Sequence, residues 1–176
     1  MLLNAWFNRD STWISHYTYQ VPTIIKHSNG GDMSNSIFNA SNVVKALIGG
    51  FLGTLAFTLM GKFVAPHLIG HSMDVAAIIA HMLGTSESIG LMMHFMVGTI
   101  VFPIGYLLIG YKYLPGPGWL RGIVFIIPVY LIAMTVVMPM AGKGMFFNSV
   151  PMSMVALMGH MVFGLILGLV VGTPKK

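Results

Sequence analysis

The sequence reads Leu91-Met92-Met93-His94-Phe95-Met96-Val97-Gly98-Thr99-Ile100 near its middle and Leu157-Met158-Gly159-His160-Met161-Val162-Phe163-Gly164-Leu165-Ile166 near its end. Both stretches match the pattern L-M-x-H-x-x-x-G-x-I, and both open a long apolar run. A histidine inside such a run is costly in a membrane unless another group binds it. The repeat therefore predicts an internal duplication, with His94 and His160 forming a paired site.

The composition around these stretches is typical of a membrane protein. Of 176 residues, 56% are hydrophobic and only 7% are charged, and the mean hydropathy is +0.82. At roughly 20 residues per spanning helix, the length allows one domain of about four spans. We therefore predict an all-α integral membrane four-helix bundle in contact with the lipid bilayer. The chain has no cysteine, which excludes disulfides, thiolate metal sites and cysteine nucleophiles.

Four apolar runs are long enough to span a membrane. They cover residues 43–65, 88–111, 120–141 and 152–172, which together make a transmembrane domain over 43–172. A polar extension over 1–42 precedes this domain, and a solvated tail over 173–176 follows it. The extension is either disordered or absent from the native chain, because Met33 is an alternative start to Met1. Pro66 is expected to end the first span, and Pro103 to kink the second.

A shorter helix is predicted between the first two spans, within residues 67–84. Ser72 is expected to cap it and Gly84 to end it, and it lies on the membrane surface or folds over the bundle. On one continuous helix, His67, His71, Asp74 and His81 would share a face. That spacing can gather a divalent metal ion, and the alternative is a solvated polar face. Gly70 is the position that would break the alignment of His67 with the others.

The cations near the span ends predict the topology. One side carries Lys45, Lys112, Arg121, Lys175 and Lys176, and the other carries only Lys62 and Lys143. The positive-inside rule then places both termini in the cytoplasm, with the protein in the inner (plasma) membrane. The spans form two helical hairpins of the same orientation, so the duplication is parallel, about an axis along the membrane normal. The cations are too few to indicate a nucleic-acid surface.

The paired histidines, His94 and His160, have two interpretations. In an up-and-down bundle the second and fourth spans are diagonal, so the imidazoles would face each other across the centre. That arrangement suits bis-histidine ligation of haem b, or of copper with further ligands. In the alternative, each imidazole donates a hydrogen bond to a carbonyl or hydroxyl group on a neighbouring helix, for which Thr54, Thr58 and Thr135 are available.

Methionines form a second candidate constellation. Most of the sixteen fall on the predicted outer half of the spans, and Met93 and Met158 stand close to the two histidines in the sequence. Thioether and imidazole ligands together suit Cu(I). In the alternative, the methionines fill irregular contacts between helices.

Conventional enzyme signatures are missing from the sequence. It contains no nucleophile–base triad, no phosphate-binding loop and no H-E-x-x-H motif, and Asp74 and Glu87 are the only acids near the spans. We therefore do not predict a hydrolase or a transporter with a buried carboxylate pathway. Two hypotheses remain. The protein binds haem or copper for electron transfer or metalloenzyme assembly, or it is a non-catalytic scaffold in a membrane complex or homo-oligomer.

Four motifs carry a resemblance to a known family. They are Met93-His94-Phe95-Met96-Val97-Gly98, Leu114-Pro115-Gly116-Pro117-Gly118-Trp119-Leu120-Arg121-Gly122, Val137-Met138-Pro139-Met140-Ala141-Gly142 and Gly159-His160-Met161-Val162-Phe163-Gly164. In this order, over about residues 47–172, they resemble a family of small bacterial four-span membrane proteins classed as a domain of unknown function. The resemblance implies the four-span fold and a bacterial membrane location, and it supplies no activity. The polar head of this chain departs from the family pattern.

Overall fold

A computed structural model of the chain describes residues 37–174. The alternative starts at Met1 and Met33 lie outside the described residues, as do the polar extension up to residue 36 and the last two lysines of the tail. Within the described part, the secondary structure is helical throughout and includes no strand. Four of its helical stretches are long and apolar enough to cross a membrane, which confirms the predicted fold class.

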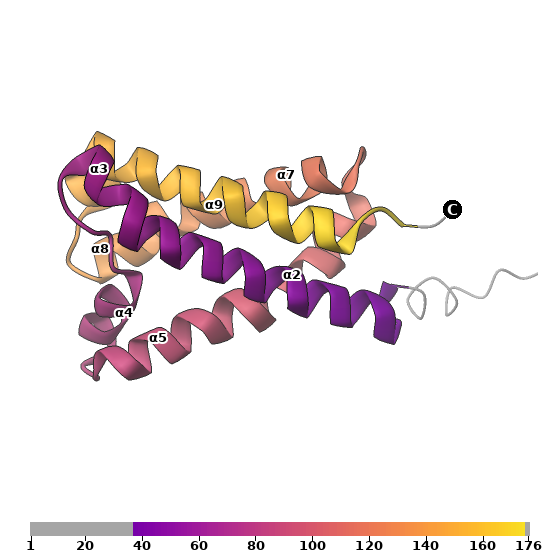
Figure 1. Cartoon of the computed structure of the whole chain (residues 1–176), viewed down its shortest axis with the longest axis horizontal. Helices are drawn as coiled ribbons and strands as arrows, with labels where there is room; N and C mark the ends of the chain where they lie inside the picture. Colours follow the sequence, from indigo (N-terminus) through magenta and orange to yellow (C-terminus); the bar gives the residue numbers. More distant parts are fainter. Residues whose placement is uncertain (1–36, 175–176) are drawn as a thin grey trace, which may run out of the picture. The chain divides into compact units, whose positions relative to one another are not determined.

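Three of the four candidate spans are made of several helical segments, and the fourth is the single helix α9 (Val150–Val171). The first span joins α2 (Ala40–Leu59) to α3 (Ala65–Ile69), and the third joins α7 (Gly118–Ile132) to α8 (Met138–Met140). The second joins α5 (Glu87–Met96) to α6 (Phe102–Gly105) and continues to Tyr111. The short helix α4 (Val75–Leu83) lies between the first and second spans. The bundle runs up and down, with α4 at the end where α5 begins (Figure 1).

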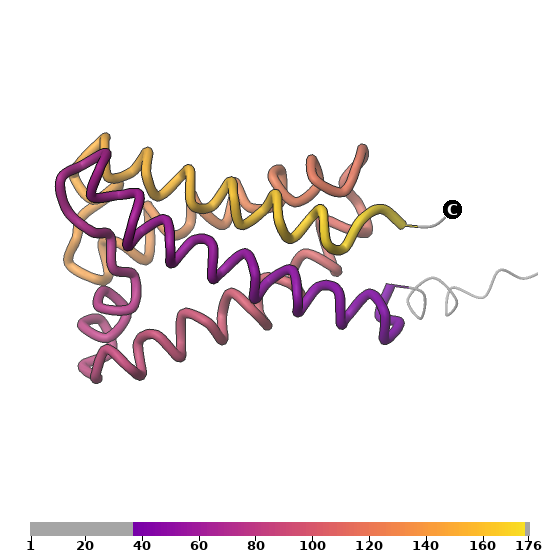
Figure 2. The backbone as a smooth tube through the Cα atoms, in the orientation of Figure 1, coloured from indigo at the N-terminus to yellow at the C-terminus, as the bar shows by residue number. Residues whose placement is uncertain are grey.

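The packing order places the second and fourth spans on opposite corners. Helix α9 packs along both α2 and α7, whereas the second span packs against α2 and against the start of α7. The tube in Figure 2 shows the chain crossing from one end to the other four times, with α2 beginning at the end where α9 finishes. Lys45 and Lys112 line one hollow at that end together with Thr173. These two cations therefore share an end of the bundle, as the charge pattern predicts.

Glycine allows α7 and α9 to come together closely. A Cβ atom added to Gly122 would overlap the carbonyl oxygen of Gly164, and one added to Gly168 would overlap that of Gly118. The four residues form two facing small-x-x-x-small pairs, which let backbones approach in lipid, where apolar burial gives no driving force between helices. Gly122 and Gly164 meet reciprocally, since a Cβ on Gly164 would lie 2.6 Å from the Gly122 carbonyl oxygen.

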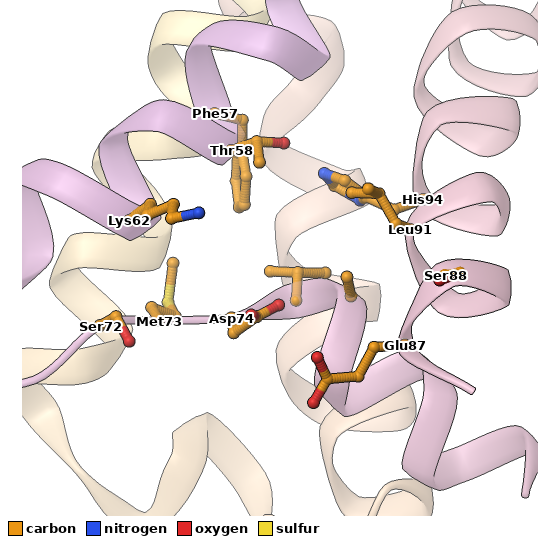
Figure 3. Close-up of a pocket in the computed structure, with 12 residues that line it drawn as sticks. Phe57, Thr58, Lys62, Ser72, Met73, Asp74, Glu87, Ser88, Leu91 and His94 are labelled. Carbon is orange, nitrogen blue, oxygen red and sulfur yellow. The ribbon is translucent and has the colours of Figure 1, made fainter. Parts of the chain in front are cut away.

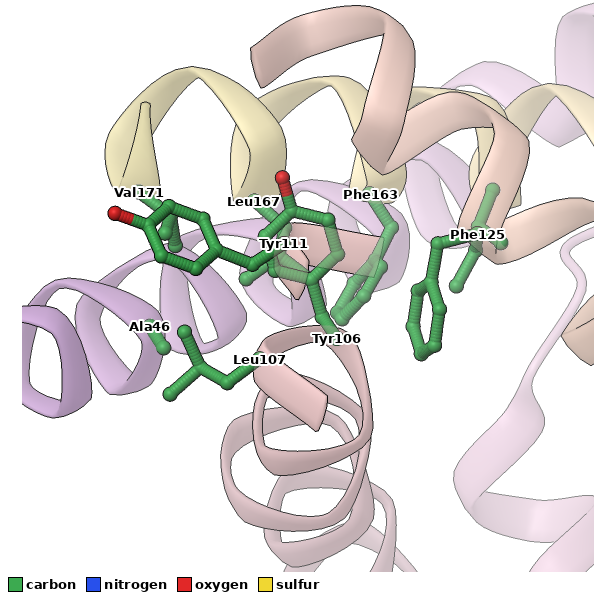
Figure 4. Close-up of a cluster of buried hydrophobic side chains, with 9 residues drawn as sticks. Ala46, Tyr106, Leu107, Tyr111, Phe125, Phe163, Leu167 and Val171 are labelled. Carbon is green, nitrogen blue, oxygen red and sulfur yellow. The ribbon is translucent and has the colours of Figure 1, made fainter. Parts of the chain in front are cut away.

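A glycine pair also brings α2 close to α9. A Cβ on Gly49 would lie 3.2 Å from the Cα atom of Leu167, and one on Gly53 would lie 2.8 Å from the ring of Phe163. Beside this contact lies a cluster of buried side chains from all four spans (Figure 4): Ala46, Tyr106, Leu107, Tyr111, Phe125, Ile126, Phe163, Leu167 and Val171. We call this cluster, with the α7–α9 glycine crossing, the closed half of the bundle.

Three of the prolines in the spans share a local pattern, whereas Pro128 lies inside the regular helix α7. Three π-helical segments each end two residues before a proline: Met60–Val64 before Pro66, Val97–Val101 before Pro103, and Ala133–Val137 before Pro139. Proline donates no backbone hydrogen bond, and its ring pushes away the carbonyl group one turn back. The amide just before the proline reaches back five residues instead, as Phe102 does to the carbonyl oxygen of Val97. The widened turn lets the helix continue through the proline.

The predicted end of the first span at Pro66 is wrong for this reason. The helix continues as α3 and ends at Gly70, whose φ of 80° lies in the left-handed region that favours glycine. The predicted start is also late. Helix α2 begins at Ala40 rather than at residue 43, because the side chain of Asn39 accepts a hydrogen bond from the amide of Asn42 at 2.8 Å.

Helix α4 is present, but its cap is not the predicted one. Asp74 caps it, with a carboxylate oxygen accepting a hydrogen bond from the amide of Ala77 at 3.0 Å, whereas Ser72 lies in the preceding loop. Asp and Ser are equally good capping residues, so the loop geometry after Gly70 decides which one is used. The predicted end at Gly84 is confirmed by its left-handed φ of 63°.

Candidate functional site

An apolar chamber occupies the half of the bundle next to α4. Its volume is about 330 Å³, and its wall is made almost entirely of apolar side chains from all four spans and α4. Phe57 comes from α2, Ile79 from α4, Val97 from the second span, Val137 from the third and Phe163 from α9. Two of the three π-helical segments that precede prolines, Val97–Val101 and Ala133–Val137, contribute residues to the chamber wall.

His94 and His160 both line the chamber. Both imidazoles pack against one aromatic ring, that of Phe57, at centroid distances of 5.8 Å for His94 and 5.0 Å for His160. The predicted placement inside the bundle, from diagonal spans, is therefore confirmed. Their role as ligands of haem or copper stays a prediction.

The environment of His160 fixes its hydrogen bonding. Its Nδ1 atom lies 2.7 Å from the carbonyl oxygen of Ala156, one turn back on α9. A carbonyl oxygen only accepts, so Nδ1 donates, and the neutral imidazole then carries its lone pair on Nε2. The rings of Phe57 and Tyr130 pack edge-on around the imidazole, the latter at a centroid distance of 5.3 Å.

His94 is held differently, although the sequence motif around it is the same. Its Nε2 atom is buried and has no hydrogen-bond partner among the described residues. The predicted threonine partners are not observed, since no hydrogen bond among the described residues joins either imidazole to them. Their hydroxyl groups donate to carbonyl groups of their own helices: Thr54 to Gly50, Thr58 to Thr54 and Thr135 to Leu131. An unpaired buried polar group costs about 1–3 kcal/mol, so this atom marks a place where a ligand would be stabilised.

Five methionines line the same chamber: Met73, Met82, Met93, Met134 and Met138. Met93 thus lies near the histidines as predicted, whereas Met158 is 45% exposed and is not part of the wall. Met158 precedes His160 by two positions, which turns it roughly 200° around the helix from the histidine. The sequence did not single out Met134, because nothing in its local pattern distinguishes it from a lipid-facing methionine.

The predicted stripe of metal ligands on one helix is wrong. His67 lies in α3, His71 in the loop after Gly70, Asp74 at the N-cap of α4 and His81 near the end of α4. The left-handed residue Gly70 breaks the helix, so these side chains share no face. Among residues 37–174, no three His, Cys, Asp or Glu side chains are grouped closely enough to hold a metal ion. The metal-ligand roles of these four residues and of Met93 and Met158 stay predictions.

A second hollow adjoins the chamber at the end of the bundle. We call it the vestibule. Its volume is about 360 Å³, and its polar lining consists of Thr58, Lys62, Ser72, Asp74, Glu87 and Ser88. Figure 3 shows the ammonium group of Lys62 and the imidazole of His94 directed into this space from facing helices. The two carboxylates come from the start of α4 and the start of α5. The sequence pointed to these acids only as the ones nearest to the spans.

A strained turn closes another side of the chamber. Phe146, Phe147 and Asn148 have φ angles of 50°, 57° and 50°, in the left-handed region that non-glycine residues rarely occupy. Phe147 lines the chamber, and the hydroxyl of Ser153 holds the turn with its oxygen 2.5 Å from the carbonyl oxygen of Phe146. Each such residue costs roughly 1–2 kcal/mol, and strain of this kind clusters at functional sites. No pattern in the sequence predicts this strained turn.

These features define a class: a multi-pass membrane protein, a four-span bundle whose packing is close in one half and which encloses an apolar chamber with two histidines in the other. The model of a family described as "Family of unknown function (DUF6789)" matches residues 40–176, and the chain belongs to this family. The match confirms the resemblance carried by the four motifs. Comparisons with curated proteins and with solved structures found no match.

Proposed function

We propose that this protein binds a largely apolar molecule in its chamber, with the Nε2 atom of His94 as the hydrogen-bonding contact. One observation carries the proposal: this buried nitrogen has no hydrogen-bond partner in residues 37–174, and its side chain lines a chamber that is otherwise almost wholly apolar. Sites for small molecules typically occupy about 300–1,000 Å³, with apolar walls and a few convergent polar groups. The chamber has that size and that character.

The second histidine supports the same function. His160 already bonds to a carbonyl group of its own helix, so its position does not depend on a ligand. Its remaining nitrogen, with its lone pair, is able to accept a hydrogen bond from a ligand donor. The pair therefore offers a ligand two contacts of different kinds near the ring of Phe57.

A soft metal ion is a second candidate, favoured by the five methionines in the same wall. Cu(I) takes thioether and imidazole ligands, and Met93, His94 and His160 would supply both kinds. Haem ligation rests on the two histidines alone. The predicted scaffold role in a membrane complex or homo-oligomer likewise stays a prediction, while contact with the lipid bilayer follows from the four apolar spans.

A matched pair of substitutions tests the proposal. Val137 lines the chamber, whereas its neighbour Val136 is 49% exposed and does not. Native mass spectrometry of the purified protein should show a bound apolar molecule that Val137→Phe removes and Val136→Phe retains. Retention of the molecule in both variants would contradict the proposal. Stoichiometric Cu(I) that is lost in His94→Gln, with no bound organic molecule in the wild type, would favour the metal instead.

We further propose that both chain termini face the cytoplasm, in the inner (plasma) membrane, with the chamber half towards the outside. The cluster of cations near Lys45 and Lys112 supports this orientation under the positive-inside rule. A reporter fused at Gly116 should read cytoplasmic, and one near Glu87 should read external. A cytoplasmic reading at Glu87 would reverse the orientation.

A further inference from the structure

We infer that the ligand is a zwitterionic membrane lipid, whose head group lies in the vestibule and whose acyl chain lies in the chamber. This inference rests on the proposed function, since it names the molecule that the chamber holds. It adds the vestibule to the binding site, with Lys62, Asp74 and Glu87 as the residues that bind the head group.

The two hollows share part of their walls, so a molecule that occupies both passes between the shared residues. Phe57, Met73, Val75 and His94 line the chamber and the vestibule alike. Phe57 and His94 lie beside each other in the vestibule wall (Figure 3), with ring centroids 5.8 Å apart. A ligand that extends from the charged space into the apolar space therefore passes beside His94.

From the vestibule to the chamber, the walls change from charged to apolar, which matches the order of groups along a lipid. Glu87 begins the second span, and Lys62 and Asp74 flank the end of the first span. The chamber is lined further along the spans, by residues such as Val97 and Phe163. His94 lies between them. A glycerolipid has a charged head, then uncharged ester groups, then hydrocarbon. An ester carbonyl group is the acceptor that an Nε2–H of His94 would bind.

The charges of the vestibule select the kind of head group. One ammonium group and two carboxylates surround the space, and among the described residues none of the three takes part in an ion pair. Lys62 suits a phosphate, while Asp74 and Glu87 suit an ammonium group. A head with phosphate and ammonium together satisfies both sets, whereas a purely anionic head would meet two like charges. The occupant is therefore zwitterionic rather than anionic.

A lipid has a route into the chamber from the side. Leu83 lines the chamber and is also 46% exposed, so the chamber wall reaches the apolar outer surface beside α4. Ile79 and Met82, from the same helix, also line the chamber. Helix α4 is therefore a short amphipathic cover, with its apolar face over the acyl chain and His81 exposed to the other side.

Lipid selectivity tests the inference. The full-length protein in nanodiscs is titrated with phosphatidylethanolamine and phosphatidylglycerol of identical chains, and bound lipid is counted by native mass spectrometry. Wild type should prefer phosphatidylethanolamine. Glu87→Gln should reduce that preference by about two- to fivefold, the range for exposed charge pairs. Lys62→Gln should weaken the binding of both lipids by about the same factor. Lys143→Gln, an exposed cation outside both hollows, should change neither.

Two results would overturn the inference: equal binding of the two lipids by wild type, or a Lys62→Gln variant that behaves like Lys143→Gln. The chamber variant separates the two proposals. If Val137→Phe loses both lipids while wild type shows no preference, only the zwitterionic inference fails. If Val137→Phe and Ile79→Phe both fold, as judged by thermal melts, and keep full lipid binding, the proposed function fails as well. Two chamber variants are used so that misfolding of one leaves the test decisive.

Discussion

The two halves of the bundle use the same helices for opposite purposes. In the closed half, Gly122 and Gly164 bring the backbones of α7 and α9 into contact. In the chamber half, Met134 of the third span and Ala156 of α9 line the chamber and belong to a second buried cluster, so the third and fourth spans stay in contact there. The difference is that facing glycines pack the closed half backbone to backbone, whereas the chamber half leaves a hollow beside its packed side chains.

The two histidines of the chamber can also be compared with each other. One motif places both imidazoles beside Phe57, but His160 is bonded to its own helix and His94 has a buried nitrogen without a described partner. The internal duplication and a ligand for His94 both stay predictions. The predictions below test the contrast between the halves, and then the contrast between the histidines.

The largest effect is expected in the closed half. Gly122→Ala places a methyl group against the carbonyl oxygen of Gly164, with backbone on both sides and no flexible side chain to move. Overpacking of this kind should cost about 3 kcal/mol of unfolding free energy. Gly105→Ala is the control, because its Cβ would lie 3.4 Å from the ring of Phe125, an ordinary contact. Equal melting temperatures for the two variants would show that the glycine crossing is not the cause of the close packing.

Cavity-creating substitutions should lower the unfolding free energy more in the closed half than in the chamber half. Leu167 is fully buried in the closed half, so Leu167→Ala should lower the unfolding free energy by about 2–3 kcal/mol. Ile79→Ala, in the chamber wall, should cost about 1 kcal/mol or less, because the removed atoms already border open space. Reversible unfolding in mild detergent measures both. A larger loss for Ile79→Ala would mean that the chamber is packed as closely as the closed half.

The two histidines should respond to the same substitution with opposite signs. His160→Leu removes a made hydrogen bond and should lower the stability of the ligand-free protein by about 1 kcal/mol. His94→Leu removes an unpaired buried nitrogen and should raise it by about the same amount, while it weakens ligand binding. Thermal melts with and without added lipid measure both effects. Loss of stability in both variants would show that His94 has a structural partner.

The smallest effect is expected outside both halves. His81 is exposed on α4, away from the chamber wall, so His81→Ala should change the unfolding free energy by less than about 0.5 kcal/mol and leave ligand binding unchanged. A clear loss of bound ligand or metal in this variant would show that His81 contributes to a binding site outside the chamber.

Much of the fold could be predicted from the sequence, because hydropathy alone marks spans of sufficient length. The glycine crossing was missed although a signal was present, since Gly118 and Gly122 stand four apart, as do Gly164 and Gly168. The π-helical segments before Pro66, Pro103 and Pro139 were missed because proline normally predicts a helix end or kink. Whether a helix continues past a proline depends on tertiary contacts that hold it in place.

The site was predicted in part. The repeated motif located His94 and His160, because a histidine in an apolar run is rare enough to stand out. It could not predict that only His160 has a hydrogen-bond partner among the described residues, since that depends on how the side chains pack around each imidazole. The chamber itself depends on Phe57, Met134 and Phe147, which come from three parts of the chain and carry no local signal. The vestibule was beyond prediction for the same reason.

The central claim is that the chamber beside His94 is a ligand site. A crystal structure of the full chain grown from a lipidic mesophase tests it most directly. The account predicts elongated density in the chamber, with one polar atom within hydrogen-bonding distance of His94 Nε2 and a head group between Lys62 and Glu87. A chamber closed by inward movement of α5, with that nitrogen bonded to another group of the protein, would contradict it.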